Sequence, residues 1–177
     1  MVFDLRIRDT VHSWASPVVT GVLLAITMLG VEWVLLLLGA VTVWRLIGVH
    51  RGRRAFVLAV GTLSAELASE LLKLAFHRPR PAIFFGLIPA ATYSFPSGHA
   101  FVATVFYGLL AGILNELYPR ERVPIAAATL LLVLLIGLSR VYLGYHYPSD
   151  ILGGWLCAVA WLAMARFRWP ALRRSAC

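Results

Sequence analysis

Residues 123–150 decide the fold, and they read VPIAAATLLLVLLIGLSRVYLGYHYPSD. The apolar run at their start is long enough for a membrane-spanning helix, and it ends in Ser139 and Arg140. His146 and Asp150 follow after a short connection and open the next apolar run. Charged groups inside or beside a span are costly, about 2.5–3.5 kcal/mol each at mid-bilayer. Their clustering at the ends of two neighbouring spans therefore indicates a function.

Two further polar clusters occupy the same kind of position. Lys73 and the dipeptide at residues 80–81, Arg-Pro, lie at the end of one apolar run, and residues 96–99, Pro-Ser-Gly-His, directly precede another. The three clusters together contain three cations, two histidines and one carboxylate. Cations bind phosphate oxygens, and histidine can act as a nucleophile or a proton donor. We interpret the clusters as a site for phosphate chemistry at a membrane surface.

The composition is that of an integral membrane protein with one domain, residues 1–177. Hydrophobic residues make up 60% of the chain, charged residues only 14%, and the mean hydropathy is +0.83. The net charge of +8 does not indicate nucleic-acid binding, because most arginines lie in short connections beside apolar runs, where they act as topology signals. Cys157 and Cys177 form neither a disulfide framework nor a metal-ligand spacing.

The lengths of the apolar runs predict an all-α bundle of about six transmembrane helices. Residues 1–14 mix apolar and charged residues in a pattern typical of a short interfacial helix. Residues 15–49 are too long for one span, which favours a tight hairpin of two short spans turning near residues 30–32. We expect the first span to be retained, and we predict four further spans at roughly 55–76, 99–117, 123–140 and 150–167.

The basic residues predict the orientation. With both termini in the cytoplasm, 12 of the 16 Lys and Arg residues fall on the inner side. The remaining four are Lys73, Arg78, Arg80 and Arg140, in or next to the three clusters. We therefore expect a protein of the cytoplasmic (inner) membrane whose site faces the periplasmic or extracellular side, against the usual bias for positive charge.

The residue types predict individual roles. Ser97 can cap the helix that follows it, Gly98 lets the backbone approach a phosphate, and His99 in the first turn can deliver a proton. For that tetrapeptide alone, a plain helix cap with a partly exposed histidine is the favoured explanation. His146 is a competent nucleophile if its second ring nitrogen donates to Asp150, which can also cap the last helix.

The first cluster supplies positive charge. Lys73 is the only lysine beside fifteen arginines, which suggests a position where arginine does not fit. Glu66, Glu70 and Lys73 follow at helical spacing, so one face of a span carries them into the bundle. Whether Glu70 pairs with Lys73 stays open at this point, as do the roles of Glu66, His77 and Arg78.

The ordered set of motifs resembles the type 2 phosphatidic acid phosphatase superfamily, the lipid phosphate phosphatases. Its three signatures, Lys-x6-Arg-Pro, Pro-Ser-Gly-His and Ser-Arg-x5-His-x3-Asp, all occur here within residues 73–150. The resemblance implies that His146 forms a phosphohistidine, that Asp150 orients it and that His99 protonates the leaving group. It also implies phosphate binding without a metal or cofactor, through Lys73, Arg80, Ser97, Gly98 and Arg140.

The expected partners are the bilayer and a lipid phosphate. The resemblance makes undecaprenyl pyrophosphate, phosphatidylglycerol phosphate, phosphatidic acid and lipid A phosphates plausible substrates, and the uncharged segment 82–95 suits the outer interface beside the pocket. Two alternatives are a lipid-to-acceptor phosphotransferase of the same superfamily and a transporter that binds a phospholipid or an anion without cleaving it. A transporter has little use for two histidines and a positioned aspartate. The oligomeric state is not predicted.

Overall fold

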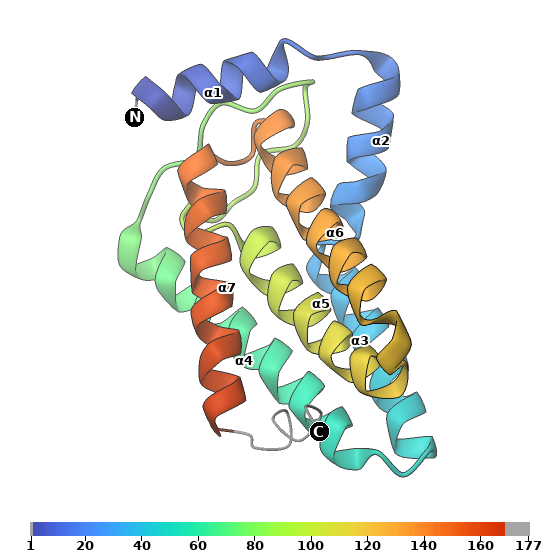
Figure 1. Cartoon of the computed structure of the whole chain (residues 1–177). Coiled ribbons are helices and arrows are strands. Elements are labelled where there is room, and N and C mark those ends of the chain that lie inside the picture. The colour runs from blue at the N-terminus through green and yellow to red at the C-terminus, as the bar shows by residue number, and fades with distance from the viewer. Residues whose placement is uncertain (1, 169–177) are drawn as a thin grey trace.

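The computed structural model describes residues 2–168, and these form helices joined by turns and loops without a β-strand (Figure 1). The elements are α1 (Val2–His12), α2 (Pro17–Met28), α3 (Glu32–Gly48), α4 (Gly52–Phe76), α5 (Gly98–Leu117), the short 3₁₀-helix η1 (Pro119–Glu121), α6 (Arg122–Tyr142) and α7 (Pro148–Arg168). The all-α prediction is confirmed for the described residues. The predicted spans at 55–76, 99–117, 123–140 and 150–167 correspond to α4, α5, α6 and α7.

Serines and prolines set the helix boundaries. Ser16 caps α2 by accepting a hydrogen bond from the Val19 amide at 3.2 Å, and Pro17 occupies the first turn, where its missing N–H costs nothing. Ser97 caps α5 in the same way. α4 ends at Phe76, and the left-handed backbone of the next residue, His77, turns the chain into the Arg-Pro-Arg-Pro segment 78–81, which cannot continue a helix.

Helix α5 is the centre of the bundle, packed against α4, α6 and α7 (Figure 1). Within an apolar stretch of 18 residues in each helix, 56% of the stretch is buried inside the protein in α5, against 39% in α4 and in α6 and 28% in α7. Phe101, Val105 and Phe106 are almost fully buried on it. The start of α5 is therefore fixed from several sides, and that start carries the Ser97–His99 motif.

The number of spans differs from the prediction. Helices α4, α5, η1 with α6, and α7 are each long and apolar enough to cross a membrane. The count rises to five if α1 and α2, which are bent by 117° at their junction, form one span. By length and composition the described residues thus provide four or five spans rather than about six.

The predicted hairpin within residues 15–49 is wrong. α2 and α3 follow one another along the bundle instead of folding back (Figure 1). Their contacts move steadily along it: Thr20 bonds to Tyr142 at the end of α6, Gly30 lies against His99 at the start of α5, and Gly39 lies against Phe106 further along α5. The chain breaks its helix at residues 29–31 without reversing, so Glu32 begins a second helical segment rather than marking a return turn.

The course of α2 and α3 also corrects the predicted termini. α1 lies at the end of the bundle where α4 and α6 finish and α5 and α7 begin, which we call the site end, and α7 finishes at the opposite end (Figure 1). The prediction that both termini share one side is therefore wrong for the described residues. Arg6 and Arg8 of α1 move to the site end, whereas the arginines at residues 45–54, 120–122 and 166–168 stay at the opposite end. Arg173, Arg174 and Cys177 lie outside the described residues.

Gly30 provides a direct test of the break between α2 and α3. A Cβ atom on Gly30 would lie 2.7 Å from Ile136 Cγ2, closer than packing allows, and 3.1 Å from His99 Cδ2, which is a tight contact. We expect Gly30→Ala to destabilise the protein by about 1–3 kcal/mol, because overpacking forces neighbours out of place. Gly21→Ala is the matched control, since no atom lies within 4 Å of a Cβ there.

Thermal unfolding in detergent measures both variants, and we expect a lower melting temperature for Gly30→Ala only. Equal melting temperatures for Gly30→Ala and the unaltered protein would contradict the close approach of this junction to His99.

Candidate active site

The site end gathers residues from all three sequence clusters. Lys73 comes from the last turn of α4, Gly98 and His99 from the first turn of α5, and Arg140 from the last turn of α6. The remaining members are Arg80 in the segment after α4, Ser97 as the cap of α5, His146 in the connection between α6 and α7, and Asp150 in the first turn of α7. Every one of these residues lies at a helix end or in the loop beside it.

His146 is almost completely buried and lies next to Arg80. The Arg80 guanidinium donates to His146 Nε2 at 3.1 Å and to the Tyr145 carbonyl at 3.1 Å. A guanidinium has only donors, so we assign the lone pair of the neutral ring to Nε2 and its proton to Nδ1. Burial, together with the positive charges of Arg80 and Arg140, lowers the pKa of His146 well below its usual 6.5. The ring is therefore a neutral base with its lone pair toward the cations.

Asp150 lies on the other side of the His146 ring and is fully buried. Its Oδ2 atom accepts a hydrogen bond from the Tyr147 amide at 2.8 Å and lies 3.5 Å from His146 Nδ1. Because α7 begins at Pro148, Asp150 is its third residue and reaches back to the amide before the helix, as in half of a capping box. Asp150 is thus the third residue of α7 rather than its N-cap, and it lies near His146 Nδ1, although 3.5 Å is longer than a good hydrogen bond.

Lys73 is 5% exposed and lies against the start of α5. A Cβ atom on Gly98 would be 3.2 Å from Lys73 Nζ and 3.4 Å from Ser69 Oγ, so the glycine leaves room for the ammonium group. Lys73 also donates to Glu70 Oε1 at 2.5 Å, which answers the question of their pairing. The lysine therefore joins the first motif to the second.

Arg140 and Ser97 complete the set of candidate phosphate-binding residues. Arg140 is buried, donates to Thr27 Oγ1 on α2 at 3.2 Å and stacks on the Tyr145 ring with 4.0 Å from its guanidinium carbon to the ring centre. The Ser97 hydroxyl accepts from the Ala100 amide at 3.4 Å. In the described residues several buried polar atoms at this end have no hydrogen-bond partner: His99 Nε2, His146 Nδ1, Arg140 Nε, Ser69 Oγ and Ser94 Oγ. Unpaired buried polar groups are rare in proteins, so this concentration is typical of a site for a polar ligand.

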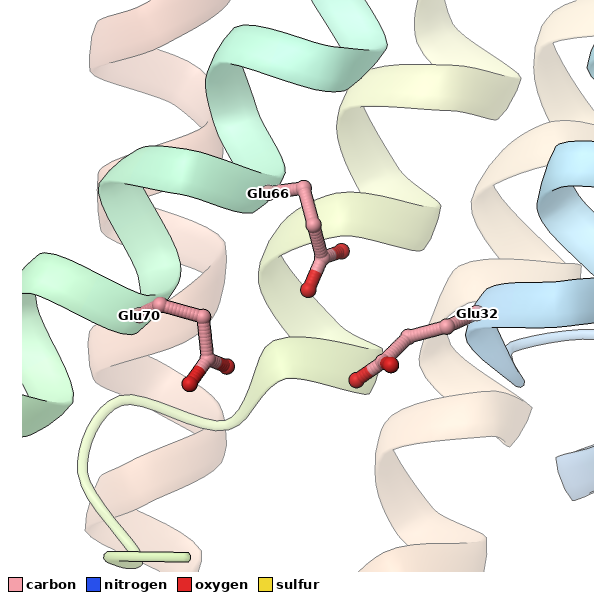
Figure 2. A group of neighbouring side chains, drawn as sticks. All are labelled: Glu32, Glu66 and Glu70. Carbon is pink, nitrogen blue, oxygen red and sulfur yellow. The ribbon is translucent and has the colours of Figure 1, made fainter.

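Three carboxylates lie beside the cations. Glu32, Glu66 and Glu70 point toward one another from α3 and α4, each with an oxygen within 4.8 Å of the others (Figure 2). Glu70 is already paired with Lys73 and Glu32 is exposed to the surroundings, so the group is an acidic edge of the site. The prediction that no metal is needed stays a prediction, and an experiment below tests it.

Sequence reasoning missed two residues that contact Asp150 or its neighbour. Arg78, whose role the sequence left open, bonds to Asp150 directly, and Asp4 of α1 bonds to both Arg78 and Ser149. The available signal was weak: Asp4, Ile7 and Arg8 recur on the helical face that contains Val11, so charged residues share the buried stripe of α1. Such a mixed stripe is more often the solvated edge of an interfacial helix. That residues 1–14 contain a helix is confirmed.

Fold and site together define an integral membrane protein whose polar centre lies at one end of a helical bundle. The chain matches the PAP2 superfamily over residues 54–174. It belongs to that superfamily, and the resemblance inferred from the three motifs is confirmed.

Relatives of known name support the family. Phosphatidylglycerophosphatase B of Bacillus subtilis is 37% identical over 50% of this chain and 45% of its own length. Undecaprenyl-diphosphatase BcrC of the same organism is 32% identical over 68% of this chain and 61% of its own length. The chain thus spans about half the length of the first curated relatives it matches.

A solved structure agrees with the fold over almost the whole chain. The PAP2-type phosphatidylglycerolphosphate phosphatase from Bacillus subtilis superposes with a TM-score of 0.90 at 24% identity, covering 98% of this chain and 87% of that one. Aquifex aeolicus LpxE superposes with a TM-score of 0.74 at 25% identity, covering 93% and 94%.

The buried position of His146 predicts its protonation behaviour. Below pH 6.5 the unfolded chain binds a proton at this position that the folded protein does not bind, so the free energy of unfolding decreases as the pH falls. We expect ¹⁵N-labelled His146, assigned by comparison with His146→Asn, to remain a neutral imidazole at pH 6.5 in detergent. A titration midpoint at or above 6.5 would contradict the effect of burial and of the two arginines.

Proposed function

We propose that this protein is a metal-independent membrane phosphatase that hydrolyses the phosphate monoester or pyrophosphate of a lipid through a phosphohistidine. The observation that carries the proposal is the environment of His146: Arg80 lies 3.1 Å from Nε2, and Asp150 faces Nδ1 at 3.5 Å. A ring held between a phosphate-binding cation and a carboxylate is arranged for nucleophilic attack on phosphorus.

In the first step, His146 Nε2 attacks the phosphorus. A P–N bond forms while the bond from phosphorus to the lipid oxygen breaks, and His99 gives a proton to that oxygen. Asp150 accepts the Nδ1 proton in a hydrogen bond that shortens as the ring becomes positive, since apo distances at catalytic sites are commonly long. In the second step a water molecule attacks the phosphorus, its proton passes to His99, the P–N bond breaks, and inorganic phosphate leaves.

The cations stabilise the transferring phosphoryl group. Lys73, Arg80 and Arg140, with the Ser97 hydroxyl and the Gly98 amide, supply the positive charge and hydrogen bonds that a divalent metal supplies in many phosphoryl-transfer enzymes. The position of Gly98 at the start of α5 adds the positive end of a helix dipole. Most of these donors sit on packed helix ends, so little reorganisation is needed when charge develops.

The substrate we propose is a lipid whose phosphate reaches the site end while its chain stays in the bilayer. The perimeter of the bundle is apolar, and large side chains such as Leu67 and Leu71 of α4 are more than half exposed beside the acidic edge. Undecaprenyl pyrophosphate, phosphatidylglycerol phosphate, phosphatidic acid and lipid A phosphates are the candidates. The relatives bear the names of phosphatases for three of these four classes.

We also propose that the site faces the periplasmic or extracellular side of the cytoplasmic (inner) membrane. The arginines at residues 45–54, 120–122 and 166–168 lie at the opposite end, in short connections or helix ends, where the positive-inside rule predicts the cytoplasm. This assignment no longer depends on the N-terminal arginines, because α1 lies at the site end.

His146→Asn tests the nucleophile. Purified protein in detergent should release inorganic phosphate from at least one lipid in a panel of prenyl pyrophosphate, phosphatidylglycerol phosphate and phosphatidic acid, and vanadate should inhibit it. We expect His146→Asn to lower kcat by about 10³-fold or more with the fold intact, whereas His50→Asn, at an exposed position far from the site, should be fully active. Binding of all three lipids without phosphate release would favour the transporter, and full turnover by His146→Asn would disprove the mechanism.

Removal of metal tests the role of the cations. We expect phosphate release to be unchanged in excess EDTA, because the charge that balances the phosphoryl oxygens comes from side chains. Loss of activity in EDTA that added magnesium restores would refute this. In that case Glu32→Gln and Glu66→Gln show whether the acidic edge holds the ion.

Cysteine labelling tests the orientation. Ala91 is exposed at the site end and Arg120 is exposed at the opposite end. In a Cys157→Ala, Cys177→Ala background, a membrane-impermeant maleimide should label Ala91→Cys in intact spheroplasts and Arg120→Cys only after permeabilisation. The reverse pattern would place the site in the cytoplasm.

A further inference from the structure

Arg78 is bonded on both sides to acidic residues from distant parts of the chain. Its NH1 group donates to Asp150 Oδ1 at 2.6 Å and to Ser149 Oγ at 2.8 Å, and its NH2 group donates to Asp4 Oδ2 at 2.9 Å. The guanidinium also stacks on the Tyr147 ring, with its carbon 4.4 Å from the ring centre. One arginine thus joins α1 to the first turn of α7.

Asp4 closes this network from the other side. Its Oδ1 atom accepts from the Ser149 amide at 3.0 Å, and its Oδ2 atom accepts from the Ser149 hydroxyl at 2.8 Å as well as from Arg78. Burial raises the pKa of Asp4, but the hydrogen bonds from Ser149 and Arg78 outweigh it and lower the pKa below its usual value. The carboxylate is therefore ionised and fully engaged, although only 7% of the residue is exposed.

We propose that Arg78 and Asp4 are positioning residues of the reaction: Arg78 holds one oxygen of Asp150 so that the other faces His146 Nδ1, and Asp4 holds Arg78. This inference rests on the proposed function of His146 as the nucleophile. In this proposal, neither Arg78 nor Asp4 contacts the phosphoryl group.

The charge balance of Asp150 supports this role. The carboxylate is completely buried, and a buried charge is stable only with a partner of opposite charge and with its oxygens hydrogen-bonded. Arg78 is the cation that makes an ion pair with it, and the Tyr147 amide satisfies the second oxygen. Without Arg78, the Asp150 carboxylate would have to form its ion pair with His146 or with one of the arginines proposed to bind phosphate. Either pairing would disturb the site directly.

The geometry separates Arg78 from the phosphate-binding arginines. Both terminal nitrogens of Arg78 are bonded to Asp4, Ser149 or Asp150, on the Nδ1 side of the His146 ring. Arg80, two residues later, is also bonded to protein groups, at Thr92 and the Tyr145 carbonyl, but its NH1 group lies on the other side of the ring, at Nε2, the atom that would attack phosphorus. The two prolines of the segment 78–81 hold this short chain extended, so that neighbouring arginines serve opposite sides of one histidine.

The experiment compares Arg78→Gln, Arg78→Lys and Asp4→Asn with the matched control Asp9→Asn, an exposed aspartate on the same helix. Each protein is assayed in detergent for kcat, KM and the vanadate inhibition constant, and its melting temperature is recorded. We expect Arg78→Gln to lower kcat about 10–100-fold, the range typical of residues that orient a reactive group, with KM and vanadate inhibition nearly unchanged. Arg78→Lys should recover part of the loss.

Asp4→Asn should lower kcat less, on the order of threefold to tenfold, because it acts through Arg78. The double variant Asp4→Asn, Arg78→Gln should then be no slower than Arg78→Gln alone, as expected for residues in one chain of contacts. Asp9→Asn should have unchanged kcat.

Three results would overturn the inference: full kcat in folded Arg78→Gln, a rise in KM and vanadate constant equal to the loss in kcat/KM, or independent, multiplying effects of Asp4→Asn and Arg78→Gln. The second result would make Arg78 a phosphate ligand. A purely structural role predicts a lower melting temperature with full kcat in the molecules that stay folded, which also contradicts the proposal. Failure of the proposed function is distinct, because it would appear as turnover by His146→Asn or as an inactive unaltered protein.

Discussion

A completely buried carboxylate, that of Asp150, is the constraint around which the site end is built. Leaving such a charge unpaired in a low-dielectric surrounding would cost several kcal/mol, so the chain must bring a cation and an amide to it. Arg78 and the Tyr147 backbone satisfy this need, and each lies in a connection beside a helix end. The same contacts fix the loop that carries His146. The stability of the first turn of α7 and the orientation of the proposed nucleophile are therefore consequences of one interaction.

The rest of the site follows from the way in which helices end. Backbone amides at the start of α5 are unpaired within the helix, and Ser97 satisfies only one of them, so that end attracts an anion. α4 and α6 finish beside it and carry Lys73 and Arg140 in their last turns, where cations are favourable to the helix dipole. Alternating helix directions thus place cationic helix ends next to anion-binding helix ends. The central packing of α5 holds the arrangement together from the apolar side.

Much of this could be predicted because the signals are local. Apolar runs of spanning length gave four helices within a few residues, and the three motifs lie at the ends of those helices, so their convergence follows from an up-and-down bundle. The pairing of Glu70 with Lys73 could not be decided, since helical spacing of three permits the contact without requiring it. The interaction of Arg78 with Asp150 could not be predicted at all: the residues are 72 positions apart, and the sequence does not say which of two neighbouring arginines faces the carboxylate.

Two predictions about the N-terminal part of the chain failed for the same reason: the hairpin in residues 15–49 was wrong, and the contact of Asp4 with the site was missed. A hairpin in residues 15–49 would return the chain to its starting side and place α1 at the end of the bundle far from Asp150, where Asp4 could serve only as a solvated charge. Because α2 and α3 instead follow one another along the bundle, α1 lies at the site end, and its bend of 117° to α2 lays it against α6 and α7. Gly30 favours this course of the chain, since a Cβ atom there would force Ile136 or His99 to shift. The contact of Asp4 was therefore not predicted because the hairpin was predicted wrongly. A prediction that α2 and α3 run in the same direction through a break at Gly30 would have placed α1 at the site end.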